Sequence, residues 1–129
     1  MLKLGAPIIP TAILGADSAR VFRLDAADSS PSGPFPSGAL PGAAPSAQGL
    51  LALDWNHDFR ADVVLAGRGG LHLLLQQEDG SFRDTTAQAS GGAPVTCDCF
   101  GAWAADIEMD GDLDIVGAPM SGAPIVLRN

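Results

Sequence analysis

The sequence predicts an all-β fold made of a repeated unit, and three observations lead to that prediction. First, the chain aligns with itself without a gap at an offset of 52 residues, which places Asp54 on Asp106 and Asp62 on Asp114. Second, short runs of β-branched and other apolar residues follow one another at the spacing typical of strands. Third, 16 glycines and 10 prolines among 129 residues favour many tight turns over long helices.

The same offset defines about two and a half copies of the unit. It places residues 51–67 on 103–119 and residues 11–24 on 63–76. The two later copies each have an apolar run, an acidic stretch, a β-branched run, a glycine-rich turn and a third run, and the middle copy adds a fourth run around FRDTT. The first copy starts after its acidic stretch. Four short strands per unit are typical of a β-propeller blade, so we expect a partial propeller.

We expect one domain over residues 1–129, because a chain of this length is too short for two comfortable domains. Within it we expect three parts: a half blade with a Pro/Gly/Ser-rich linker (1–46), a blade (47–98) and a partial blade (99–129). Residues 1–18 also carry a lysine, a short apolar stretch and small residues, which are features of a signal peptide. We favour a strand of the repeat there, because residues 11–24 align with 63–76.

Charge excludes some classes of partner. The net charge is −8, and the seven basic residues are scattered. Nucleic acids and anionic membrane surfaces need clustered Lys and Arg, so we expect neither as a partner. No apolar run reaches the ~18 residues that cross a bilayer, so we expect no membrane span.

The acidic stretch DIEMDGDLD (106–114) carries five carboxylates at alternating positions. Such crowding is unfavourable without a counter-charge, since each pair at ~4 Å costs about 1 kcal/mol even at the dielectric constant of water. Oxygen ligands at alternating positions can wrap a hard cation, and Ca²⁺ accepts 6 to 8 of them. The expected ligands are the side chains of four residues and the carbonyl of a fifth: Asp106, Glu108, Asp110, Asp114 and the carbonyl of Asp112.

The earlier copy, DWNHDFRAD (54–62), repeats the scheme with less charge. Its expected ligands are the side chains of Asp54, Asn56, Asp58 and Asp62 and the carbonyl of Arg60. Phe59 stands where the later copy has Gly111, and a bulky residue disfavours the positive φ that such a turn needs. We therefore expect weaker calcium binding in this loop.

Two alternatives compete with a propeller-type calcium loop. An EF-hand requires a bidentate Glu at position 12, where the two copies have Leu65 and Gly117, and its flanks are helical. A solvated turn rich in Asp and Gly is the simpler alternative, because these residues favour turns. Two such loops in register within a repeat favour metal binding over that alternative.

The residues that bracket the second loop resemble a known family. Phe100-Gly101 before DIEMDGDLD, and Gly117-Ala118-Pro119 after it, resemble the FG-GAP repeat, related to VCBS repeats, of integrin α-subunit propellers and cartilage acidic protein. In the middle copy Gln48 replaces the Phe, and Ala66-Gly67-Arg68 replaces GAP. The resemblance implies a seven-bladed propeller with Ca²⁺ between the first two strands of its blades, acting in adhesion or recognition.

The cysteines and histidines offer little chemistry. Cys97 and Cys99 permit a disulfide across one residue, and a metal site there lacks partners at ligand spacing, so an ordinary loop is the favoured interpretation. His57 and His72 are expected to be exposed residues without a role. Trp55, Trp103 and Phe100 are most simply explained by packing within blades.

Three functions remain open at this point. The favoured one is a non-enzymatic, calcium-binding module for protein or carbohydrate recognition, extracellular or periplasmic, that forms a homo-oligomer or joins neighbouring blades of a longer chain. An accessory part of a larger secreted enzyme is the alternative. An enzyme in its own right is disfavoured, because the sequence has no GxSxG, HExxH or phosphate-binding loop.

Overall fold

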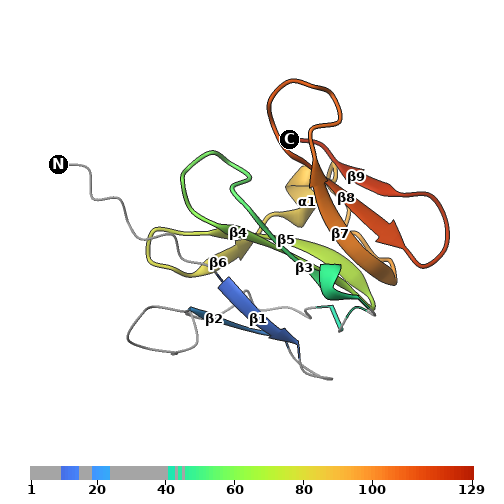
Figure 1. The fold of residues 1–129 in the computed structure, drawn as a ribbon, viewed down its shortest axis with the longest axis horizontal. Helices are drawn as coiled ribbons and strands as arrows, with labels where there is room; N and C mark the ends of the chain where they lie inside the picture. Colours follow the sequence, from blue (N-terminus) through green and yellow to red (C-terminus); the bar gives the residue numbers. More distant parts are fainter. Residues whose placement is uncertain (1–9, 15–18, 24–40, 43, 45) are drawn as a thin grey trace.

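Consecutive antiparallel strands form three sheets in the described part of the chain (Figure 1). This computed structural model describes residues 10–14, 19–23, 41–42, 44 and 46–129. Two short helical segments, η1 (Ala47–Gly49) and α1 (Thr86–Ala89), accompany the strands, so the fold is mostly β, as predicted. The three sheets are formed by β1 (Pro10–Leu14) and β2 (Ala19–Arg23); by β3 (Leu50–Leu53), β4 (Asp62–Gly67), β5 (Gly70–Gln76) and β6 (Phe82–Asp84); and by β7 (Cys99–Ala105), β8 (Asp114–Pro119) and β9 (Ile125–Leu127).

The remaining residues include much of the expected half blade and its linker. Residues 1–9, residues 15–18 and most of the linker lie outside the described residues, so the signal-peptide alternative stays a prediction. No helix within the described ranges is long and apolar enough to cross a membrane.

The 52-residue repeat is present in the strand pairing itself. β1 pairs Thr11 with Phe22, and β4–β5 pairs Val63 with Leu74, each residue 52 positions later. The first hairpins agree in the same way, since β3–β4 pairs Leu50 with Leu65 and β7–β8 pairs Ala102 with Gly117.

The last hairpin departs from the offset by one residue. β8–β9 pairs Ile115 with Leu127, where the offset predicts Val126. The turn accommodates the extra residue, and its positive-φ glycine is Gly122 (φ 95°), one position later than the offset predicts from Gly69 (φ 90°). The repeat is therefore gapless as far as β8 and one residue longer after it.

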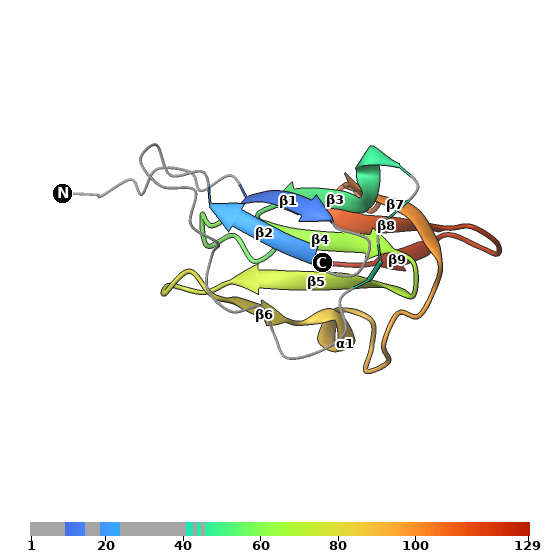
Figure 2. The same cartoon turned by 90° about the horizontal axis from the view of Figure 1, so that it is seen from below.

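The middle sheet lies between the other two in the view of Figure 1, and the strands of all three run in similar directions in Figure 2. Every residue of β4 is buried. Because alternate side chains of a strand point to opposite faces, both faces of β4 are covered. One face contributes Val64, Leu71 and Leu73 to a core cluster that also contains Ile115 and Leu127 of the third sheet.

The corresponding face of the third sheet is exposed. Trp103 pairs with Val116, and Val116 pairs with Val126, so their side chains form one row across β7, β8 and β9. Trp103 is 41% exposed and Val126 39%. In the middle sheet, Val64 occupies the position equivalent to Val116 and is fully buried. We call Trp103, Val116 and Val126 the apolar row.

Two glycines allow each sheet to approach the segment before it. A Cβ on Gly101 would lie 2.6 Å from Cβ of Gln48, and a Cβ on Gly49, its counterpart in the repeat, would lie 2.6 Å from Cβ of Ala44. Ser46 Oγ donates a hydrogen bond of 2.6 Å to the carbonyl of Phe100 at the same contact. Close approach of backbone to backbone therefore explains the glycine of the Phe100-Gly101 pair.

The CDC tripeptide joins the two larger sheets. Cys97 and Cys99 form a disulfide, which the sequence permitted without deciding their state. The residue between them, Asp98, accepts a hydrogen bond through Oδ1 from Gly69 N (2.8 Å) and through its carbonyl from Met120 N (2.7 Å). Asp98 thereby links the β4–β5 turn to the β8–β9 turn.

Candidate functional site

The first acidic residue of each loop organises the turn through backbone hydrogen bonds. Asp54 accepts from Asp58 N at Oδ1 (3.0 Å) and from Phe59 N at Oδ2 (2.9 Å). Asp106 accepts from Asp110 N (3.1 Å) and Gly111 N (3.0 Å) in the same way. Each loop connects the first and second strands of its sheet. The two hydrogen bonds accepted by Asp54 have counterparts, 52 residues later, in those accepted by Asp106.

The last acidic residue of each loop is buried and ties the loop to the sheet. Asp62, with no exposed surface, accepts from Trp55 N and from Gln76 N, both at 2.8 Å. Burial raises the pKa of the Asp62 carboxyl above its usual range, although these two hydrogen bonds act to lower it. Both oxygens of Asp62 therefore already accept hydrogen bonds from backbone N–H groups.

Asp114 has the equivalent position in the second loop. It is 3% exposed and accepts from Ile107 N and Asn129 N, both at 3.0 Å. Asn129 lies 53 residues after Gln76, in agreement with the longer last hairpin. Each carboxylate keeps further lone pairs beyond these two hydrogen bonds.

The backbone of the two loops also takes the same conformation. His57 and Met109 both have φ of 57°, and Phe59 has φ of 63° where Gly111 has φ of 100°. Phe59 adopts the positive φ of its glycine counterpart despite its bulk, because the hydrogen bond to Asp54 holds its N–H in place. A left-handed conformation costs a non-glycine residue about 1–2 kcal/mol.

The first loop carries its own positive charge. Asp58 Oδ2 accepts from Arg60 Nη2 (2.7 Å) and Asn56 Nδ2 (2.9 Å), and Asp58 Oδ1 accepts from Arg60 N (2.9 Å). Burial acts to raise the pKa of Asp58, but the hydrogen bonds from Asn56 and Arg60 outweigh it and lower the pKa. The guanidinium group of Arg60 is thus paired with the Asp58 carboxylate, at the centre of this candidate site.

The second loop has no such internal cation. Asp112 stands where the first loop has Arg60, and its N–H donates to Asp110 Oδ1 at 3.1 Å. Glu108 forms an ion pair with Arg128 at the end of β9. The second loop therefore retains more uncompensated negative charge than the first.

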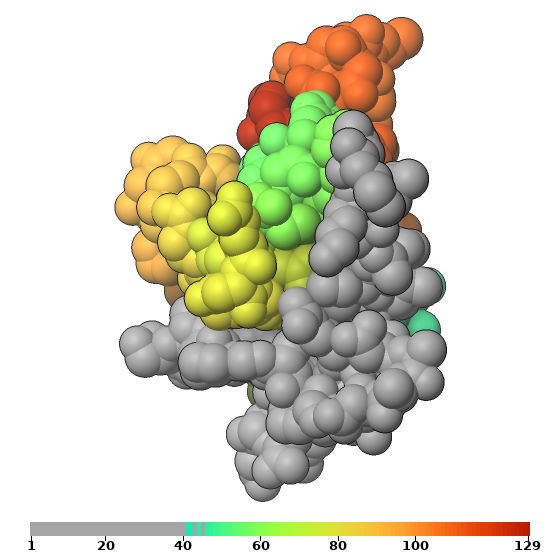
Figure 3. Space-filling view, turned by 90° about the vertical axis from the view of Figure 1, so that its left-hand side faces the viewer, coloured from blue at the N-terminus to red at the C-terminus, as the bar shows by residue number. Residues whose placement is uncertain are grey.

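The two loops lie next to each other, as the green and orange segments in Figure 3 show. His57 Nε2 is 3.5 Å from Asp112 Oδ1, so the loops contact each other. His57 is exposed, as predicted, and it also supplies one side of this contact. The predicted ligands fall into two neighbouring loops, but the described residues include no preformed cluster of three or more His, Cys, Asp or Glu side chains suited to a metal.

His72 also has a partner that sequence reasoning missed. Its Nδ1 lies 2.6 Å from Oδ2 of Asp84, whose Oδ1 accepts from Thr86 Oγ1 (2.5 Å) and Thr86 N (2.9 Å). Burial acts to raise the pKa of Asp84, but the hydrogen bonds from Thr86 and His72 lower it overall. The pairing brings side chains of β5 and β6 together across the sheet. No local sequence motif predicts it, because the two residues are 12 positions apart.

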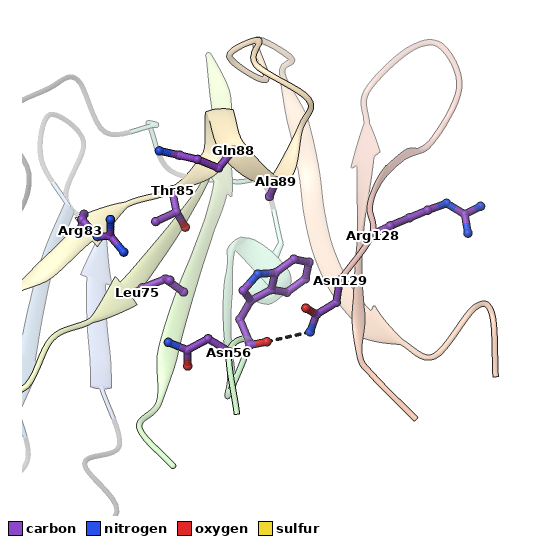
Figure 4. Close-up of a pocket in the computed structure, with 9 residues that line it drawn as sticks. Asn56, Leu75, Arg83, Thr85, Gln88, Ala89, Arg128 and Asn129 are labelled. Carbon is purple, nitrogen blue, oxygen red and sulfur yellow. Dashed lines mark hydrogen bonds between the residues drawn. The ribbon is translucent and has the colours of Figure 1, made fainter. Parts of the chain in front are cut away.

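A cavity of about 360 Å³ lies beside the first loop, between the outer strands of the middle sheet and the end of β9 (Figure 4). Nothing in the sequence predicted this cavity. Its lining is Trp55, Asn56, Leu75, Arg83, Thr85, Gln88, Ala89, Arg128 and Asn129.

The fold and the paired loops define a repeat protein of antiparallel β units, with an acidic loop in each of the two larger sheets. Comparison with protein families identifies the repeat: residues 54–117 match the model of the FG-GAP-like repeat. This segment belongs to the FG-GAP-like repeat family, whose repeats typically form propeller blades. No curated protein and no solved structure matched the chain.

Proposed function

We propose that the chain is a calcium-binding propeller module that recognises a protein or a carbohydrate. The observation that supports it most is the frame of the second loop, in which Asp106 and Asp114 fix the backbone of a loop that carries five acidic residues and no internal cation. FG-GAP repeats often bind Ca²⁺. The ion would neutralise the loop and stabilise the turn between β7 and β8.

The residues that would hold the ion are those expected from the sequence. Asp106, Glu108, Asp110 and Asp114 offer carboxylates, and Asp112 offers its carbonyl. For Glu108 to bind, its ion pair with Arg128 must open. In the first loop Asp54, Asn56, Asp58, Asp62 and the carbonyl of Arg60 form the weaker set, because Arg60 already neutralises Asp58.

Calcium titration tests the proposal. We expect a dissociation constant of about 10⁻⁴ to 10⁻³ M, as in extracellular calcium modules, and a rise in melting temperature with added calcium, since a ligand of the folded state stabilises it. Asp110→Asn should abolish most of the calorimetric signal, whereas the matched change Asp58→Asn in the first loop should leave it nearly intact. Equal losses in both variants, or no binding by the unaltered protein, would refute the assignment.

The proposed setting and chemistry follow from that affinity. Sites of this strength fill only where calcium is abundant, which favours an extracellular or periplasmic location. The module would have no catalytic role of its own, and turnover of any glycan by the purified chain would contradict this part of the proposal. Cell fractionation tests the location.

The apolar row supports association with a further β-sheet. Its equivalent in the middle sheet, around Val64, is covered by the third sheet of the same chain. A further sheet of the same type would cover Trp103, Val116 and Val126 in the same manner, whether supplied by a second copy or by a neighbouring blade.

A further inference from the structure

The cavity beside Trp55 contains hydrogen-bond donors that the protein itself does not use. Within the described residues, the guanidinium group of Arg83, the side-chain amide of Gln88 and the indole N–H of Trp55 have no hydrogen bond or ion pair. Polar groups at the wall of a cavity are normally satisfied, by protein or by water. Arg83 and Gln88 are exposed and Trp55 is half-buried, so water solvates these donors in the free protein, and a ligand rich in acceptors can take the place of that water.

The charge of the lining has the opposite sign to that of the molecule. The chain has 15 acidic and 7 basic residues, yet the nine lining residues include two arginines and no acidic side chain. Arg128 is paired with Glu108 and points away from the other lining residues in Figure 4. Arg83 is then the available charge, on the opposite side of the cavity from Asn129.

The apolar part of the wall is packed against the core. Trp55 and Ala89 are half-buried and pack against the core cluster, which also contains Leu75. Asn129 Nδ2 donates a hydrogen bond of 2.7 Å to the carbonyl of Trp55, which fixes the backbone of this residue from the other sheet. An aromatic side chain held in this way presents a defined surface at little cost in conformational entropy.

We propose that this cavity binds a hexuronic acid residue of an acidic carbohydrate; the inference rests on the proposed recognition function and specifies its ligand. A sugar ring has an apolar C–H face that would contact the indole, and hydroxyl groups that would accept from the amide of Gln88. Its carboxylate would pair with the guanidinium of Arg83, which suits planar anions. The volume lies at the lower end of the range of small-molecule sites, in keeping with a single ring.

Tryptophan fluorescence provides a direct test. In a Trp103→Phe background Trp55 is the remaining tryptophan, so its emission reports on the cavity alone. Glucuronic acid and trigalacturonic acid are titrated against matched neutral glucose and trigalactose, with acetate as a control for simple anion binding. We expect a saturable response at roughly millimolar uronate, and at least tenfold weaker binding of the neutral sugars and of acetate.

Variants locate the site. Arg83→Gln should weaken uronate binding about tenfold or more, and Arg68→Gln, an exposed arginine in the β4–β5 turn, should not change it. Because Arg83 is exposed, its substitution should leave the melting temperature unchanged. No response to either uronate, equal binding of glucose and glucuronic acid, or an unaffected Arg83→Gln variant would overturn the inference.

The same titrations in calcium and in chelator separate this inference from the calcium proposal. Uronate binding that persists without measurable calcium binding would support the cavity and refute the metal assignment. Calcium binding without any uronate response would support the metal assignment and overturn the cavity inference.

Discussion

At the scale of single residues, the backbone of the first loop is strained at an exposed position. Phe59 is 98% exposed and has positive φ, so its ring gains nothing from burial while its backbone is held in an unfavourable region. The repeat has glycine at the equivalent position of the second loop. The backbone conformation of Phe59 is therefore unfavourable, and the hydrogen bonds of the loop offset its cost in free energy.

We predict that Phe59→Gly stabilises the protein. Relief of the left-handed strain should exceed the added flexibility of the unfolded chain and give roughly 0.5–1 kcal/mol in the free energy of unfolding. Chemical denaturation measures it. Phe59→Ala is the control, because it removes the ring and keeps the strain; an equal gain from alanine would attribute the effect to the ring instead.

The Asp84 carboxylate predicts a dependence of stability on pH. Its pKa is lowered in the folded protein, so its contribution is present above the unfolded value near 3.8 and is lost as pH falls through the lower folded value. The Asp84→Asn variant should therefore lose less stability than the unaltered protein between pH 5 and pH 3. Denaturation at each pH measures the two slopes, and parallel curves would contradict the prediction.

At the scale of elements, the acidic loops combine two roles that sequence alone does not separate. The alternation of acidic residues, the flanking strands and the 52-residue register were all predictable, because they depend on local pattern and period. The roles of the individual carboxylates were not, because they depend on contacts across the fold. Asp62 accepts from Gln76, 14 residues away, and Asp58 is neutralised by Arg60, which had been assigned only a carbonyl.

We predict that Asp114 stabilises the fold even without metal. Asp114→Ala leaves the N–H groups of Ile107 and Asn129 without their acceptor and should cost about 2–4 kcal/mol in chelator. Asp112→Ala removes an exposed side chain of the same loop and should cost less than about 0.5 kcal/mol. Denaturation of both variants in chelator compares them; similar effects would mean that the carboxylate at 114 acts only as a ligand.

At the scale of the whole molecule, the repeat explains which surfaces are covered and which are open. The cavity beside Trp55 was not predictable, because it is formed where the middle sheet meets the end of β9, with residues from five segments. The pairing of His72 with Asp84 was not predictable either, because it depends on how β5 aligns with β6 across the sheet. The apolar row, in contrast, follows from the repeat once the sheets are known, since its counterpart is already covered.

We predict that the apolar row drives association. The unaltered protein should show a molecular mass that rises with concentration in light scattering, because an exposed apolar sheet face of this kind favours contact with another sheet. Val116→Asp should shift the distribution toward the monomer, and Ala87→Asp, which adds the same charge on α1, should not. A mass independent of concentration in the unaltered protein would contradict the prediction.

The pairing of strands that are neighbours in sequence also sets an order in time. Contacts between nearby residues form quickly, so each sheet can assemble as soon as its last strand has left the ribosome. The middle sheet would then be complete before the third sheet is made. Until then, Val64 and Leu73 would be exposed to solvent, because the third sheet covers them in the finished fold. During that interval the middle sheet would expose an apolar face of the same kind as the apolar row of the finished third sheet. A chaperone that recognises apolar surfaces on nascent chains would bind to this face.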